Sequence, residues 1–243
     1  MQVARENITI VLNRPKYAGN IGAVARGARN MGVEKLCVVS DRPFPAEEMK
    51  QMATHVAADL VDNIRYCDRL EDALGGFRTV VGMTARMGSV RGPAITPRQM
   101  AAELVDISQN NPVALLFGAE DRGLTNADLH FCDLVVNIPT AEFKSLNLSH
   151  AVMIICYELF VAERELPSFT PKLATVAELE GMHDQIKEVL QQVGFLNPEN
   201  PDYWMLHIRR FFSRVKLQAR EVKIIRGICR QLAWYGEQGR KNA

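Results

Sequence analysis

The chain has 243 residues, of which 47% are hydrophobic and 23% charged, with a net charge of +1. This composition is typical of a soluble globular protein, and the length suffices for one domain and an extension. The longest strongly apolar stretch, around residues 151–156, is far shorter than the roughly 20 residues that cross a membrane, and the N-terminus lacks the basic start and apolar core of a signal peptide. We therefore expect a cytoplasmic protein that does not enter a membrane.

The first two thirds of the chain alternate between expected strands and helices. Strands are predicted at 8–12, 35–40, 79–83, 113–117 and 133–138, and helices at 20–31, 45–61, 68–74, 97–108 and 148–163. The strands are apolar on both faces. This pattern predicts an α/β fold with a mainly parallel sheet covered by helices on both sides.

A change of composition at 167–175 predicts a linker, because this segment contains two prolines and three hydroxyl residues. Beyond it only helical patterns follow, at 176–193, 203–216 and 220–235. We therefore expect a larger domain at 1–166 and a small all-helical domain at 176–243.

Basic residues are concentrated near the C-terminus. From Met205 onward there are ten Lys or Arg against two Glu, a local net charge of +8, so the rest of the chain carries −7. A basic segment on an otherwise acidic protein favours a polyanionic partner such as a nucleic acid. A solvated helix face is the alternative interpretation.

The five cysteines are widely spaced and contain no CxxC pair: Cys37, Cys67, Cys132, Cys156 and Cys229. Most of them lie inside apolar runs. We expect buried reduced thiols rather than a disulfide framework or a zinc site, and no bound metal.

Three polar turns lie at the ends of expected strands and helices, in positions typical of a ligand site. They lie at 19–26, 116–125 and 143–151. In parallel α/β sheets, ligands bind outside the carboxyl ends of the strands. Ser145 and Asn147 come directly before a long apolar helix, whose N-terminus favours an electron-rich ligand.

The turns match neither of the common nucleotide-binding motifs. The turn at Asn20 and Gly22 lacks the full GxGxxG spacing of a dinucleotide site, and a Walker A lysine is absent. The residues alone therefore indicate a nucleoside-like ligand that is not obviously NAD or ATP.

Taken together, the three segments resemble the SpoU/TrmH branch of the SPOUT methyltransferases. The motifs of that family read Asn-x-Gly-x-x-x-Arg, Gly-x-Glu-x-x-Gly-Leu and Ser-Leu-Asn-x-Ser-x-Ala. Their counterparts here begin at Asn20, Gly118 and Ser145, in the same order. The resemblance extends to the TrmJ-like tRNA 2′-O-methyltransferases, which have a C-terminal helical extension, and so covers nearly the whole chain.

The resemblance implies a deep trefoil knot at the C-terminal end of the larger domain, which periodicity cannot predict and general topology rules would exclude. In this family the knot forms the pocket for S-adenosylmethionine. The positions implied as cofactor-binding are Met83, Thr84, Ala85, Gly118, Ile138, Lys144, Ser145 and Leu146. Lys144 is a departure, since the TrmJ-like pattern often has a small residue there.

The resemblance also implies the catalytic residues, namely Asn20, Arg26, Glu120, Ser145 and Asn147. By the resemblance, Arg26 is the residue that acts on the ribose 2′-hydroxyl, often described as its general base. Because free arginine holds its proton tightly, we prefer a guanidinium that orients the hydroxyl and stabilises the developing charge; both roles stay open. Asn20 and Glu120 are expected to orient Arg26 or the ribose.

Each of these residues has a structural alternative when taken alone. Asn20 alone would be interpreted as a helix N-cap and Arg26 as a surface residue. The ordered motifs reverse that preference but say nothing of His150, for which helix packing is expected. Trp204 and Phe211 are likewise expected to pack between helices rather than to stack on bases.

The implied activity is 2′-O-methylation of a tRNA ribose, at the anticodon-loop nucleotide of tRNA position 32, by a homodimer. Alternatives are methylation of another tRNA or rRNA nucleotide, an RNA-binding protein without catalysis, and a DNA-binding regulator. The residues expected to contact RNA phosphates are Arg209, Arg210, Arg214, Lys216, Lys223 and Arg226.

Overall fold

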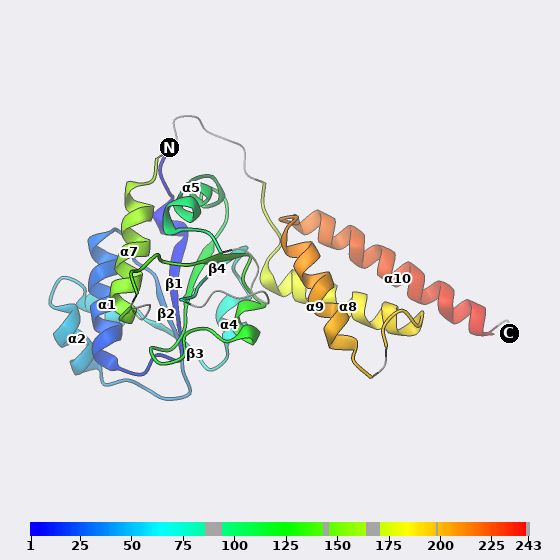
Figure 1. The fold of residues 1–243 in the computed structure, drawn as a ribbon, viewed down its shortest axis with the longest axis horizontal. Helices are drawn as coiled ribbons and strands as arrows, with labels where there is room; N and C mark the ends of the chain where they lie inside the picture. The colour runs from blue at the N-terminus through cyan, green and yellow to red at the C-terminus, as the bar shows by residue number, and fades with distance from the viewer. Residues whose placement is uncertain (86–93, 143–145, 164–170, 198, 242–243) are drawn as a thin grey trace. The chain divides into compact units, whose positions relative to one another are not determined.

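The computed structural model describes residues 1–85, 94–142, 146–163, 171–197 and 199–241 (Figure 1). The chain divides into two compact units, Met1–Thr170 and Pro171–Ala243. No helix in the described ranges is long and apolar enough to cross a membrane.

The first unit is built on a six-stranded sheet with the order β3-β2-β1-β5-β4-β6, in which every pair of neighbours is parallel. The strands are β1 (Ile8–Asn13), β2 (Leu36–Val39), β3 (Arg65–Cys67), β4 (Thr79–Met83), β5 (Val113–Phe117) and β6 (Leu134–Val136). All residues of β1, β2, β4 and β5 are buried, so the prediction of a mainly parallel sheet covered on both faces is confirmed.

Edge strand β3 was not predicted. It has only three residues, and Arg65 and Tyr66 are exposed, so no apolar run marks it in the sequence. It is identified only by its parallel pairing with β2, in which Val38 lies opposite Tyr66.

Three of the helices, α1, α2 and α7, lie together on one side of the sheet, where α1 packs against both α2 and α7 (Figure 1). The helices of this unit are α1 (Ala18–Asn30), α2 (Ala46–Ala53), α3 (Ala58–Asp62), α4 (Leu70–Leu74), α5 (Pro97–Ile107), α6 (Asn126–Leu129) and α7 (Leu148–Val161), after a 3₁₀ turn at Arg5–Asn7.

The helix predicted at 45–61 is wrong as a single element, because it is divided into α2 and α3. Thr54 ends α2 with a φ of 59°, a left-handed conformation that cannot continue a helix. The short α6 was not predicted either. It begins with a capping box in which Thr125 and Asp128 bond each other's backbone N–H.

The glycine of the first motif has a packing role. A Cβ atom built on Gly22 would lie 1.9 Å from the carbonyl oxygen of Met49, so α1 and α2 cross at a distance that only glycine permits. Gly22 therefore sets the position of the helix that carries Asn20 and Arg26.

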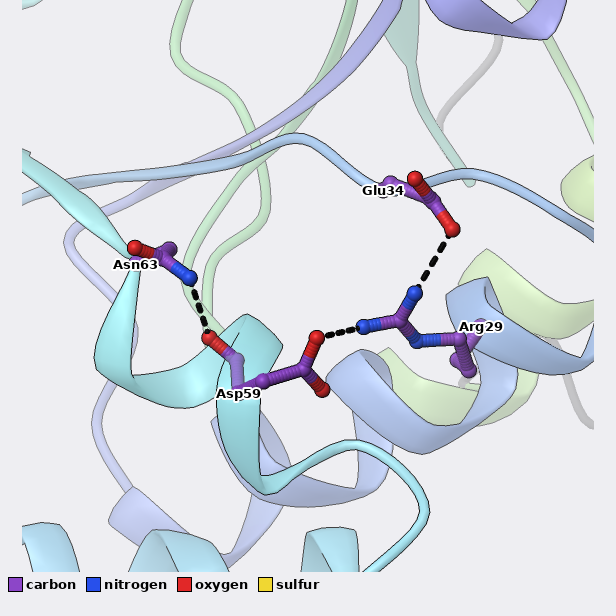
Figure 2. A network of polar contacts seen from close by, with 4 residues as sticks. All are labelled: Arg29, Glu34, Asp59 and Asn63. Atoms are coloured by element: carbon purple, nitrogen blue, oxygen red, sulfur yellow. Dashed lines mark hydrogen bonds and ion pairs between the residues drawn. The ribbon is translucent and has the colours of Figure 1, made fainter.

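A polar network fixes the other end of α1 (Figure 2). Arg29 Nη1 donates to Glu34 Oε1 at 2.6 Å, Nη2 pairs with the carboxylate of Asp59 in α3, and Asn63 Nδ2 donates to the carbonyl oxygen of Asp59 at 2.8 Å. The hydrogen bond between Arg29 and Asp59 raises the pKa of Arg29 and lowers the pKa of Asp59. The network joins α1 to α3 and to the loop that enters β2.

The trefoil knot stays a prediction, because residues 143–145, on the segment that leads into α7, lie outside the described residues.

The second unit contains α8 (Val176–Gln192), α9 (Pro201–Ser213) and α10 (Ala219–Lys241). Its core includes Met182, Ile186 and Met205. The unit begins before α8, since the N–H of Ala174 donates to the carbonyl oxygen of Leu217 at 2.7 Å. Part of the segment predicted as a linker thus packs with the helices, while the exact domain limits stay a prediction.

Candidate active site

The site lies where the order of the strands in the sheet reverses. From β1 the chain continues to β2 and β3 on one side, whereas β5, β4 and β6 lie on the other. The carboxyl ends of β1 and β5 are therefore neighbours at a topological switch point, the place where open α/β sheets bind ligands.

A chain of hydrogen bonds joins all three motifs at this point. Glu120, after β5, accepts from Asn20 Nδ2 in α1 at 2.8 Å through Oε1 and from the backbone N–H of Lys16 at 2.8 Å through Oε2. Asn20 Oδ1 in turn accepts from Asn147 Nδ2, before α7, at 3.2 Å. Three of the predicted catalytic residues are thus brought into direct contact.

The N-terminus of α7 sets the donor-to-acceptor direction of these hydrogen bonds. Asn147 Oδ1 accepts from the backbone N–H of Ser149 at 2.8 Å and from its hydroxyl at 2.7 Å, which leaves the amide nitrogen to donate to Asn20. Asn147 is therefore the N-cap of α7. Asn20 is not a cap, because α1 already begins at Ala18.

The loop after β5 also carries an exposed ion pair. Lys16 Nζ lies 2.7 Å from Asp121 Oδ2, and Arg122 Nε lies 3.5 Å from the same oxygen. The hydrogen bond from Lys16 lowers the pKa of Asp121. This pair adds a second link between the loops that follow β1 and β5.

Arg26 is exposed on α1 and makes no hydrogen bond or ion pair with any described residue. Asn20 and Glu120 bond each other and make no hydrogen bond with Arg26, so their expected role of orienting Arg26 or the ribose stays a prediction. The guanidinium is free to meet a ligand, and its catalytic role stays a prediction.

A cavity of about 340 Å³ opens between the loops, within the range of small-molecule sites. Six of the predicted cofactor residues line it: Met83, Thr84, Ala85, Gly118, Ile138 and Leu146. Lys144 and Ser145 lie outside the described residues, so neither their predicted cofactor contacts nor the catalytic role of Ser145 is placed.

The same cavity is lined by residues that the sequence did not assign to the cofactor: Phe117, Ala119, Asp121, Arg122, Gly123, Leu124, Leu148 and Ala151. Most of these lie within or next to the predicted motifs, and that adjacency was the available signal. Glu120 lines the cavity as well as taking part in the hydrogen-bond chain.

The wall of the cavity depends on a tight fold of the loop after β5. A Cβ atom on Gly118 would lie 2.1 Å from the carbonyl carbon of Gly123, which has a φ of 63°. The N–H of Gly123 donates to the carbonyl oxygen of Ala119 at 2.7 Å and closes the turn. The backbone of this wall is therefore packed so closely that no side chain fits at Gly118.

Asn137 supports Thr84, a residue of the cavity lining, and was missed by sequence reasoning. Its Nδ2 donates to the carbonyl oxygen of Thr84 at 2.9 Å, while the N–H of Thr84 donates to Val136 at 2.9 Å. The only signal for this role is a polar residue directly after the strand β6. Asn137 thus ties the ends of β4 and β6 together beside the cavity-lining Thr84.

The predicted RNA-binding residues of the second unit differ in their surroundings. Arg209 is paired with Glu180, and Arg226 Nε donates to Gln185 Oε1 at 2.9 Å. Arg210, Arg214 and Lys223 have no ion pair with any residue of the described ranges. Lys216 has a φ of 47° at the turn between α9 and α10. The contact of these six residues with RNA stays a prediction.

Fold and site together define an α/β protein with a nucleoside-sized cavity at the switch point of a parallel sheet, followed by a basic helical unit. Residues 7–157 match the model of the SpoU rRNA Methylase family, and residues 177–242 match that of the tRNA methyltransferase TrmJ, C-terminal domain. The chain belongs to the SpoU methylase family, which confirms the resemblance drawn from the motifs.

Similar proteins match over most of the chain. The tRNA (cytidine/uridine/adenosine-2′-O-)-methyltransferase TrmJ of Pseudomonas aeruginosa is 36% identical over 92% of this chain and 92% of its own. The tRNA (cytidine/uridine-2′-O-)-methyltransferase TrmJ of Pectobacterium atrosepticum is 36% identical over 92% and 95%. The crystal structure of TrmJ from Z. mobilis ZM4 superposes with a TM-score of 0.80 at 26% identity, over 93% of this chain and 98% of that one.

Proposed function

We propose that this chain is an S-adenosylmethionine-dependent tRNA (ribose-2′-O-)-methyltransferase. The observation that carries the proposal is the hydrogen-bonded contact of Asn20, Glu120 and Asn147 beside a cavity of about 340 Å³. Family membership and relatives that match both units support the assignment of the substrate as tRNA.

The cavity suits the cofactor because its lining is largely apolar and because Gly118 lets the loop after β5 fold closely along one wall. Met83, Thr84, Ala85, Gly118, Ile138 and Leu146 would hold the adenosine and amino-acid parts. The cofactor supplies an already activated methyl group, so most of the rate enhancement can come from positioning the acceptor hydroxyl.

Arg26 is the group proposed to act on the acceptor. An exposed guanidinium with no partner among the described residues can contact the ribose 2′-oxygen or the adjacent phosphate and stabilise negative charge as it develops. We favour this role over proton acceptance, because arginine gives up its proton only far above neutral pH.

Within tRNA, we propose the anticodon-loop nucleotide at position 32 as the target. This finer assignment is supported by the resemblance to the TrmJ-like group; the relatives from Pseudomonas aeruginosa and Pectobacterium atrosepticum are named for cytidine and uridine, the first also for adenosine. A different tRNA or rRNA nucleotide, or RNA binding without catalysis, is the alternative. A cytoplasmic location forms part of the same proposal.

We also propose that the protein is a homodimer. Tyr157, Phe160 and Val161 on α7 are 50%, 45% and 45% exposed, more apolar surface than a monomer needs at the end of one helix. Tyr157→Glu should shift sedimentation toward the monomer and lower activity. A wild-type protein that sediments as a fully active monomer would contradict the proposal.

The activity is tested by incubating the purified protein with S-adenosylmethionine and unmodified bulk tRNA, then mapping 2′-O-methyl nucleosides by mass spectrometry. We expect a new 2′-O-methyl group at position 32. A methyl group elsewhere would move the target nucleotide, and no methyl group at all, despite tRNA binding, would leave only the RNA-binding alternative.

A further inference from the structure

One face of α9 combines exposed aromatic rings with arginines. Tyr203, His207 and Phe211 recur every four residues, and Arg210 and Arg214 lie beside them at helical spacing. Tyr203 is 54% exposed and Phe211 63% exposed. We call these five residues the aromatic-cation face.

Core packing does not account for this face. The opposite side of α9 already supplies the apolar contacts of the unit, where Met205 is buried and Ile208 and Phe212 pack against the core. The expectation that Trp204 and Phe211 pack between helices is wrong, because 46% of Trp204 and 63% of Phe211 are exposed. Large rings in contact with solvent call for another explanation.

Some of the rings on α9 contact one another edge-on while they stay exposed to solvent. Tyr203 contacts His207 edge-on, with centroids 4.9 Å apart, and Trp204 edge-on, with centroids 5.9 Å apart. Trp204 in turn contacts Phe195 at 6.3 Å. Edge-on contacts restrict the side chains before any ligand arrives, which lowers the entropy cost of binding.

The charges beside the rings have no counterions within the described residues. Arg209, on the buried side, is paired with Glu180, whereas Arg210 and Arg214 make no ion pair with any described residue. Arg210 is half-buried, and its Nη2 has no hydrogen-bond partner among the described residues. Cations next to open ring faces complement a ligand with both negative charges and flat groups.

We propose that the aromatic-cation face binds unpaired nucleotides of the RNA substrate, with bases stacked on Tyr203 and Phe211 and phosphates bound by Arg210 and Arg214. An apolar protein partner would not match the two cations, and a double helix hides its base faces. The inference rests on the proposed action on tRNA and deepens it, because it assigns the second unit to single-stranded loop nucleotides rather than to duplex backbone alone.

Salt dependence separates stacking from phosphate contact, because only phosphate contacts release counterions. In the full chain, Tyr203→Leu with Phe211→Leu keeps apolar area and removes the rings. We expect tRNA affinity to fall at least about tenfold with an unchanged slope of log Kd against log salt. Tyr203→Phe with Phe211→Tyr should keep the affinity, as should the control Ile224→Ala with Ile228→Ala, an exposed apolar pair on α10.

The arginines should behave in the opposite way. Arg210→Gln and Arg214→Gln are each expected to reduce the salt slope by about 0.7. In a Trp234→Phe background Trp204 is the only tryptophan, and an eight-nucleotide single-stranded RNA should quench its fluorescence more strongly than the same sequence as a duplex.

The outcomes distinguish this inference from the proposed function. If the arginine variants weaken tRNA binding but the leucine variants do not, stacking is wrong and tRNA binding by this unit stands. If the leucine variants change the sedimentation coefficient instead of RNA affinity, the face contacts a second copy and the inference fails. If no variant affects tRNA binding while methyl transfer persists, the second unit does not dock the substrate.

Discussion

Glu120 accepts a hydrogen bond from Asn20 at 2.8 Å across one hundred residues of sequence. A carboxylate at neutral pH can only accept, so it determines that the amide nitrogen of Asn20 faces β5 and its oxygen faces Asn147. The three loops of the site are therefore joined by a chain of bonds with one direction.

Reversing that direction at one residue should disrupt the site. Asn20→Asp places an acceptor against the carboxylate of Glu120, and we expect methyl transfer to fall at least about a hundredfold, because a lost charged hydrogen bond and a like-charge contact together cost about 3 kcal/mol or more. Adding Glu120→Gln restores a donor opposite an acceptor and should recover much of the rate. Single-turnover kinetics measure both; an undiminished rate in Asn20→Asp would contradict the bond's role.

Arg26→Ala should reduce single-turnover methyl transfer by about 10²–10³-fold, as expected for the loss of one charge-stabilising group. Affinity for S-adenosylhomocysteine, measured by titration calorimetry, should change little, since Arg26 is not among the cavity-lining residues. Arg26→Lys should recover little, because lysine lacks the planar fork. A near-normal rate in Arg26→Ala would exclude Arg26 from the chemistry.

Gly118→Ala should abolish binding of S-adenosylhomocysteine, because the added Cβ would lie 2.1 Å from Gly123 and force the cavity wall to move. Gly76→Ala is the matched control, since a Cβ there meets nothing within 4 Å. Calorimetry with the cofactor product and with NAD measures both affinity and selectivity. Binding of NAD but not of the product would refute the methyltransferase assignment.

The Arg209–Glu180 pair should make stability of the second unit depend on pH. Burial raises the pKa of Glu180, but His183 and Arg209 outweigh it and lower that pKa to about 2. The folded pKa thus lies below the ordinary value of 4.5, so the stabilisation is complete above about pH 4.5 and is lost as the pH falls toward 2.

Urea unfolding followed by tryptophan fluorescence measures this effect, since both tryptophans, Trp204 and Trp234, lie in the second unit. Arg209→Gln should lower the unfolding midpoint at pH 6 and flatten its decline between pH 4.5 and 3. Lys187→Gln, which breaks a more exposed pair with Asp202, should have a smaller effect. Equal effects of the two substitutions would mean that burial of Glu180 contributes nothing.

The strands with continuous apolar runs were predictable from sequence, because burial on both faces of a parallel sheet leaves a clear pattern. Edge strand β3 and the break at Thr54 were not, since pairing with β2 and a left-handed backbone leave no mark on hydrophobic periodicity. These features depend on tertiary contacts rather than on local sequence.

The residues of the site likewise divide into those that the sequence identifies and those that only the structure shows. The motifs identified Asn20, Glu120 and Asn147, but not the hydrogen bonds that join them, because spacing along the chain carries no information on distances between loops. Asn137 has no motif at all, and its role is visible only through its bond to the carbonyl oxygen of Thr84.

The close crossing of α1 and α2 at Gly22 has a consequence for genetics. Because any side chain at this position would collide with the backbone of Met49, a substitution there disturbs folding before it reaches the chemistry. An allele with a substitution at Gly22 should therefore be temperature-sensitive: cells grown at low temperature should contain the modified RNA, and cells grown at high temperature should lack it. An inactive allele at Arg26, whose side chain is exposed, should stay inactive at every temperature.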